Sequence, residues 1–227
     1  MRQLARPAHV LFSFLFLLTI CAPACPASSR TSSAFPKPAM DNPVATSHGQ
    51  ETAVLSGGCF WGIQAIYEHT RGVLSATSGY AGGSADTAHY DVVSGGNTGH
   101  AESVRVIFDP AQITYGQILM IFFSVAHDPT ELNKQGPDWG SQYRSMVFYS
   151  NTEQKRIVDA YIAQLTSARV YPQKIVTQVA PLTEFYPAES YHQDYVKHHQ
   201  TNPYIVINDL PKLANFKKSY PELYREY

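Results

Sequence analysis

Apolar and polar side chains follow two different periods along this chain, and the changes between them predict alternating strands and helices. Residues 101–108 alternate strictly, which is typical of a strand with one buried face. Apolar side chains recur every three or four positions over 115–126 and 151–169, where they predict two amphipathic helices, the second capped by Asn151. Further strands are predicted at 52–55, 73–80, 144–149 and 174–180, and shorter helices at 60–70, 90–94 and 189–199.

The first six main elements are strand, helix, strand, strand, helix, strand, an order that resembles a split βαβ or ferredoxin-like layout with insertions. We therefore predict an α+β fold with a two-layer core, in which helices pack on an antiparallel or mixed sheet and long loops carry function. The folded catalytic domain is expected over 51–200. Residues 28–50 are rich in Ser, Thr, Ala and Pro and predict a flexible linker. Residues 201–227 show no strong pattern and predict an irregular C-terminal tail, which contains no cysteine.

Residues 1–27 have the composition of a secretory signal peptide. Two arginines precede an apolar run at 10–20 that is too short to span a bilayer, and small residues at 22–24 precede Cys25. Cleavage before Cys25 or after Ala27 fits this pattern. An uncleaved anchor is disfavoured by the short run, and a lipid anchor on Cys25 by the lack of a preceding leucine. We therefore expect an exported protein, periplasmic or secreted.

Composition and charge disfavour several classes of partner and site. The formal net charge is −1, so nothing indicates a nucleic-acid partner. The three cysteines are Cys21, Cys25 and Cys59, too few for a disulfide framework or a cysteine-based zinc site once the signal segment is removed. Glu189 and His192 form a carboxylate–imidazole pair at helical spacing, but the pair occurs once, so we predict no metal site.

The segment SGGCFWG at 56–62 lies where a strand period gives way to a helical one, and it holds Cys59. A cysteine there would meet the free N–H groups and the positive dipole end of a helix N-terminus. That setting favours thiolate and lowers a cysteine pKa from about 8.5, to about 3.5 in extreme cases. The alternative is a small buried apolar side chain, which the flanking glycines disfavour because they admit solute to the sulfur.

Glu102 opens the strand at 101–108 and, by the period of two, shares the face of Val104, Val106 and Phe108. A carboxyl group on an apolar face has its pKa raised, because burial disfavours the charged form. It would then stay protonated near neutral pH and could donate a proton. In the alternative reading, Glu102 turns outward at the strand end and is solvated.

A polar loop at 135–145, QGPDWGSQYRS, crowds Asp138, Gln142, Tyr143 and Arg144 between glycines and a proline. Long loops in compact domains often carry function. In the alternative reading, these polar side chains satisfy the backbone of their own loop. The residues alone leave both readings open.

Taken together, these stretches resemble the A-type peptide methionine sulfoxide reductase family over about residues 52–200. The matching segments are GCFWG at 58–62, GYAGG at 79–83, GHAE at 99–102, HDPT at 127–130, DWGSQYRS at 138–145 and AESYHQDY at 188–195. GCFWG alone is moderately specific, whereas all six segments in this order are very specific. The resemblance implies an oxidoreductase that repairs oxidised methionine in proteins and reduces free methionine sulfoxide. It further implies action on the S epimer, without a bound metal or flavin.

The resemblance also implies which residues act. Cys59 would attack the sulfoxide sulfur as a thiolate, release the thioether and become a sulfenic acid. Glu102 would protonate the sulfoxide oxygen, which is a poor leaving group until it is protonated. Tyr90 and Tyr143 would hydrogen-bond the same oxygen, Asp138 would help to polarise it, and Phe60 and Trp61 would bind the substrate methyl group.

One departure from the family pattern concerns the regeneration of Cys59. Many relatives carry recycling cysteines in the C-terminal tail, but residues 60–227 contain none. An external thiol would therefore reduce the Cys59 sulfenic acid, and a thioredoxin-like protein, a glutaredoxin and glutathione are the candidates. Cys25 could act only if it survives processing and the linker folds back. We expect a monomer with no bound cofactor.

Two other classes of function remain open. A cysteine-dependent acyl transferase or hydrolase would use His100 or His192 as the base, and it would need an imidazole in contact with Cys59. An exported module that binds methionine-rich peptides would use Phe60, Trp61 and the tyrosines without turnover.

Overall fold

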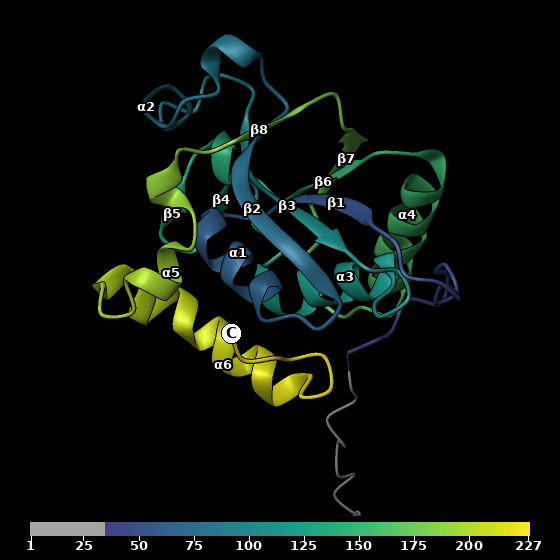
Figure 1. Cartoon of the computed structure of the whole chain (residues 1–227). Helices are drawn as coiled ribbons and strands as arrows, with labels where there is room; N and C mark the ends of the chain where they lie inside the picture. The colour runs from purple at the N-terminus through teal and green to yellow at the C-terminus, as the bar shows by residue number, and fades with distance from the viewer. Residues whose placement is uncertain (1–34) are drawn as a thin grey trace, which may run out of the picture. The chain divides into compact units, whose positions relative to one another are not determined.

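A six-stranded mixed sheet forms the centre of the computed structural model, which describes residues 35–227 (Figure 1). Its strands are β1 (Glu51–Ser56), β2 (Val73–Ala81), β3 (Ala101–Phe108), β6 (Met146–Tyr149), β7 (Gln178–Pro181) and β8 (Phe185–Pro187). They lie in the order β7-β6-β1-β3-β2-β8, and all neighbours are antiparallel except β6 and β7. Two shorter strands, β4 (Lys134–Gln135) and β5 (Asp138–Trp139), form a separate hairpin.

Helices pack on this sheet and give an α+β fold, as predicted. The α-helices are α1 (Phe60–Glu68), α2 (Tyr90–Val93), α3 (Tyr115–Ile121), α4 (Thr152–Ser167), α5 (Tyr195–His198) and α6 (Leu210–Ser219). Short turns of other helix types are η1 (Ala85–Thr87), η2 (Phe122–Ala126), η3 (Ser141–Tyr143), η4 (Ser190–His192) and η5 (Ile205–Asp209). Side chains of α1, α3 and α4 share one core with buried residues of β1, β3 and β6, whereas a smaller apolar cluster contains Val54, Ala81 and Phe148.

Most predicted elements form close to their expected positions. β3 spans the predicted 101–108, and α4 begins after Asn151, whose Oδ1 accepts a hydrogen bond of 2.8 Å from the Gln154 backbone N–H. The helix predicted at 189–199 is instead divided into η4 and α5, because Gln193 is extended and Asp194 has a φ of +53°. The strand predicted at 174–180 begins only at Gln178.

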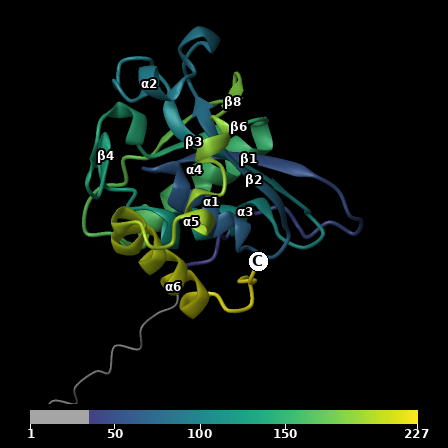
Figure 2. The ribbon, with the colours of Figure 1, turned by 60° about the vertical axis from the view of Figure 1, so that its left-hand side comes forward.

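The tail predicted to be irregular at 201–227 is helical over much of its length, so that prediction is wrong. η5 leads directly into α6, which packs against α1 (Figures 1 and 2). Ile205 and Phe216 are fully buried, and Ile205 packs in one cluster with Ala65 of α1. Pro211 fits the first turn of α6, where a backbone N–H has no helical partner.

Residues 35–50 lack regular secondary structure but are bound to the domain, so the prediction of a flexible linker is wrong for this part of 28–50. The Asp41 carboxylate accepts hydrogen bonds from the Thr114 hydroxyl at 2.5 Å and from the Gly116 backbone N–H at 2.8 Å. Both donors lie at the start of α3, where a carboxylate satisfies N–H groups that have no helical partner. The segment is thereby fixed to the helix N-terminus.

The predicted signal peptide at 1–27 and the first part of the predicted linker lie outside the described residues. Within residues 35–227, no helix is both long enough and apolar enough to cross a bilayer.

Replacing Asp41 by alanine should lower the free energy of unfolding by about 1–2 kcal/mol, because the start of α3 loses a capping carboxylate. Urea denaturation of the two proteins measures the difference. Asp159→Ala is the matched control, since Asp159 lies exposed on α4 and, within residues 35–227, pairs only with Lys155. Its expected effect is within about 0.5 kcal/mol, and an equal loss in both variants would contradict the role of Asp41.

Candidate active site

Cys59 lies in the turn between β1 and α1, as the N-cap residue of the helix. Its side chain is half-buried, and it is a free cysteine. Gly58 before it has a φ of +96°, which favours glycine, and a Cβ there would stand 2.5 Å from Cγ of Gln135. The loop that carries Gln135 therefore closes tightly over this turn, while part of Cys59 stays accessible.

The prediction that the Cys59 pKa is lowered is wrong for the resting site. Burial raises the pKa of the Cys59 thiol well above its usual value, and the negative charges of Glu102, Asp209 and Asp138 raise it further. The Trp61 backbone N–H at the helix N-terminus lowers the same pKa but is outweighed. In the free protein at neutral pH, Cys59 is therefore a protonated thiol.

Glu102 lies on the apolar face of β3, as predicted, with its side chain 3% exposed. The antiparallel register pairs Leu55 with Val104, so the start of β3 lies beside the end of β1 and the Cys59 turn. Glu102 Oε2 accepts a hydrogen bond of 3.1 Å from the Phe60 backbone N–H. Burial raises the pKa of Glu102 to about 8, and this one hydrogen bond only partly opposes the shift. The carboxyl group is therefore protonated at neutral pH.

Tyr90 begins α2 and Tyr143 ends η3, and the segments that carry them are hydrogen-bonded to each other. The Tyr90 backbone N–H donates to Glu189 Oε1 at 3.0 Å, and the Gln142 side-chain amide donates to the Ser94 carbonyl at 3.0 Å. Burial raises the pKa of both phenols, and the nearby Glu102 charge raises them further. Both tyrosines therefore remain hydrogen-bond donors over the physiological pH range.

Asp138 is half-buried on β5 and accepts a hydrogen bond of 2.5 Å from the Tyr204 hydroxyl. Burial raises the pKa of Asp138, while the Tyr204 hydroxyl and Lys212 lower it. Tyr204 belongs to the tail, and sequence reasoning missed it. Its signal was weak, because an isolated tyrosine in a segment without a period cannot be assigned to a site.

Phe60 and Trp61 differ in their access to a ligand. Phe60 is 1% exposed and lies in the core, whereas Trp61 is half-buried and stacks on Tyr195 with ring centroids 3.8 Å apart. The Trp61 indole N–H donates to Nδ1 of His192 at 3.2 Å, and Tyr204 contacts the indole edge-on. Trp61 is thus held in one orientation, and the Phe60 ring lies next to it, with the two ring centroids 6.4 Å apart.

Neither candidate imidazole acts as a base for Cys59. His100 Nδ1 accepts from the Gly83 backbone N–H at 3.2 Å, and its Nε2 donates to the Ser84 carbonyl at 2.9 Å. His192 Nδ1 is occupied by Trp61. Among the described residues, neither ring makes a hydrogen bond to Cys59, so the geometry does not support an acyl transferase or hydrolase.

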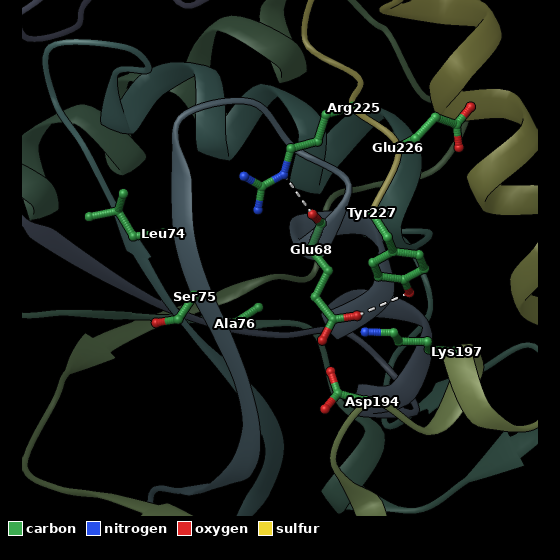
Figure 3. Close-up of a pocket in the computed structure, with 9 residues that line it drawn as sticks. All are labelled: Glu68, Leu74, Ser75, Ala76, Asp194, Lys197, Arg225, Glu226 and Tyr227. Atoms are coloured by element: carbon green, nitrogen blue, oxygen red, sulfur yellow. Dashed lines mark hydrogen bonds between the residues drawn. The ribbon is translucent and has the colours of Figure 1, made fainter.

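A pocket of ≈ 460 Å³ lies around Glu68, at the other end of α1 from Cys59 (Figure 3). The Tyr227 hydroxyl donates to Glu68 Oε2 at 3.2 Å, and Arg225 Nε donates to the Glu68 carbonyl at 2.9 Å. Burial raises the pKa of Glu68 to about 8. The pocket is separated from Cys59 by the length of the helix, so it is not the site of reaction. Over residues 35–227, no cluster of three or more potential ligand side chains could hold a metal ion.

This chain is similar to known proteins of one family. A family model described as peptide methionine sulfoxide reductase matches residues 51–223. A relative from Mesorhizobium japonicum, named peptide methionine sulfoxide reductase MsrA 2, is 55% identical over 178 residues, which are 78% of this chain and 91% of the relative. A relative of the same name from Synechocystis sp. is 50% identical over 193 residues, covering 84% of this chain and 90% of the relative.

Two solved structures share the fold. Mxr1 from Saccharomyces cerevisiae in reduced form has a TM-score of 0.60 and 29% identity, covering 70% of this chain and 94% of its own. Methionine sulfoxide reductase A of Corynebacterium diphtheriae has a TM-score of 0.58 and 34% identity, covering 67% of this chain and 76% of its own. The chain therefore belongs to the A-type peptide methionine sulfoxide reductase family and is an oxidoreductase that reduces methionine sulfoxide.

Proposed function

We propose that this reductase acts on the S epimer of methionine sulfoxide, in peptides and as the free amino acid, with Cys59 as nucleophile and Glu102 as acid. The observation that carries the proposal is the buried Glu102 carboxyl group, which binds the N–H of Phe60 at the start of the helix that Cys59 caps. An acid and a nucleophile are thereby fixed to the same helix turn. The central strand order β6-β1-β3-β2, with antiparallel neighbours, supports a ferredoxin-like description of the scaffold.

The reaction transfers one oxygen atom and two electrons. Cys59 attacks as the thiolate, and Glu102 gives its proton to the sulfoxide oxygen, so that the oxygen can leave the substrate sulfur. The S–O bond of the substrate breaks and a Cys59 S–OH bond forms. Cys59 gives up two electrons and becomes the sulfenic acid, and these two electrons reduce the sulfoxide to the thioether.

Neutral hydrogen-bond donors stabilise the developing charge on the oxygen. Tyr90 and Tyr143 keep their hydroxyl protons at physiological pH, because burial raises the pKa of both. Asp138 orients Tyr204 and contributes to the polar side of the site. The half-buried indole of Trp61, supported by Phe60, receives the substrate methyl group.

An external thiol reduces the Cys59 sulfenic acid, since residues 60–227 contain no second cysteine. A thioredoxin-like protein, a glutaredoxin and glutathione have the required chemistry. The proposal of export, to a periplasm or the exterior, rests on the sequence of residues 1–27 alone. Export would bring a repair enzyme to methionines that meet oxidants directly, and the enzyme is expected to act as a monomer.

Cys59→Ser should abolish the dithiothreitol-dependent reduction of a methyl S-sulfoxide, because a hydroxyl is a far weaker nucleophile than a thiolate. Product formation by chromatography measures the loss, and thermal unfolding checks that the variant folds. Equal turnover by the variant would rule out Cys59 as the nucleophile.

A protein that lacks residues 1–27 contains Cys59 as its only thiol. It should accumulate one sulfenic acid per chain when substrate is added without reductant. Mass spectrometry after trapping with dimedone measures the stoichiometry. Cys59→Ser is the control and should take up no label. Thioether release without any trapped or oxidised Cys59 would contradict the sulfenic acid route.

Glu102→Gln should slow sulfenic acid formation at pH 7 by about 10²–10⁴-fold, less than the loss of Cys59, because the amide still donates a hydrogen bond. In the wild type, the rate should fall as pH rises through about 8, where Glu102 loses its proton. The variant should lack this decline. Stopped-flow measurement from pH 5 to 10 tests both points, with the exposed Glu153→Gln as control. A wild-type profile in Glu102→Gln would show that another group is the acid.

A further inference from the structure

A third carboxylate, Asp209, lies against the helix that carries Cys59, and the mechanism above does not use it. Its side chain is at the junction of η5 and α6 and is 1% exposed. Within residues 35–227, neither of its carboxylate oxygens has a hydrogen-bond partner. The nearest cation is Lys212, whose Nζ is 3.6 Å from Oδ1. A buried carboxylate with free acceptor atoms is costly to keep, which makes its position informative.

The position of Asp209 depends on the absence of a side chain at Gly62. A Cβ on Gly62 would stand 2.1 Å from Asp209 Oδ1, closer than atoms can approach. Because Cβ atoms tilt toward the N-terminus of a helix, the carboxylate fills the space on the side of α1 where Cys59 is the N-cap. Glu102 meets the same first turn at the Phe60 N–H, two residues earlier. Two carboxyl groups therefore approach one helix end.

These two carboxyl groups hold protons with different strength. Burial raises the pKa of Asp209 to about 6, opposed by the Lys212 ammonium, whereas the Glu102 pKa lies at about 8. At neutral pH, Asp209 is ionised and Glu102 is protonated. A site in which two neighbouring carboxyl groups differ in this way has one group suited to accept a proton and one suited to donate it.

We infer that Asp209 accepts the proton that the Cys59 thiol must lose before it attacks the sulfoxide. The inference deepens the proposed function and rests on it. The thiol proton passes to the Asp209 carboxylate, directly or through one water, while the Glu102 proton passes to the substrate oxygen. The products are the thioether, the Cys59 sulfenic acid, protonated Asp209 and ionised Glu102. Exchange of one proton with solvent at each carboxyl group restores the resting state.

The charged and titratable groups that face this proton path come from five elements. The pKa of Cys59 is raised by the charges of Glu102 on β3, Asp138 on β5 and Asp209 itself. The pKa of Asp209 is lowered by Lys212 on α6 and raised by Asp138. The charges of Cys59, Asp138 and Asp209 raise the pKa of Tyr204, which lies beside η5. Lys212 also lowers the pKa of His127, which follows η2. Lys212 is the cation among them, and it lowers the pKa of Asp209 against the effect of burial.

Asp209→Asn is the first test, because asparagine has the same shape and cannot take the proton. The rate of sulfenic acid formation in a single turnover is measured from pH 5 to 10. The wild-type rate should rise through about pH 6, where Asp209 ionises. The variant should lose this rise and be slower at pH 7 by on the order of a hundredfold.

Asp159→Asn removes the same charge from an exposed position on α4 and should leave the profile unchanged. Gly62→Ala should displace the carboxylate and reproduce the Asp209→Asn profile, and the double variant should lose no more than either single variant. Alanine is a good helix former, so this substitution is compatible with α1. Additive losses in the double variant would contradict the inference.

A different role for Asp209 would give a different result. If Asp209 only holds Cys59 protonated by its negative charge, Asp209→Asn should react as fast as the wild type or faster at pH 7, and iodoacetamide should alkylate Cys59 faster. That outcome overturns the inference. Should Asp209→Asn fail to fold, Lys212→Met replaces it: loss of the cation should move the acid limb to higher pH, and an unmoved limb contradicts the inference. Failure of the proposed function itself would appear separately, as a wild type that forms no sulfenic acid.

Discussion

The proposed chemistry depends on a carboxyl group that is buried with little compensation for its charge. Glu102 is 3% exposed and has one backbone N–H, from Phe60, as its hydrogen-bond donor. The ionised form is therefore disfavoured, and the proton stays on the group at neutral pH. The antiparallel pairing of β1 and β3 produces this situation, because it sets the first residues of β3 beside the turn that leads into α1. The same pairing brings the proposed acid and the proposed nucleophile together.

The C-terminal segment completes the site in a second way. The Tyr204 hydroxyl donates a hydrogen bond to Asp138, and Asp209 lies against Gly62 at the start of α1. Ile205 and Phe216 hold this segment in place by burial, so no covalent link to Cys59 is needed to position it. The tail therefore has a structural role around Cys59, although residues 201–227 contain no cysteine.

The sequence predicts the elements with a clear period and the residues that sit on them. The alternation over 101–108 places Glu102 on the buried face, and its raised pKa follows from that face alone. The tail helix could not be predicted in this way, because few of its residues are buried and Pro211 breaks the helical pattern of the sequence. Residues 35–50 carry no period, and only the tertiary contact of Asp41 with α3 shows that they are fixed.

The Cys59 pKa shows where local reasoning reaches its limit. A helix N-terminus does lower the pKa, through the Trp61 N–H, but the sequence cannot show that carboxylates from three distant segments converge on the same sulfur. Burial and the negative charges of Asp209 and Asp138 keep the thiol protonated at neutral pH, where Glu102 is itself protonated. Since the thiolate is the form that oxidants attack, a protonated resting thiol is less exposed to them than a permanently ionised one. A sulfoxide carries no net charge, so the carboxylates do not repel it. The raised pKa is therefore compatible with catalysis, provided that proton transfer from Cys59 accompanies the attack.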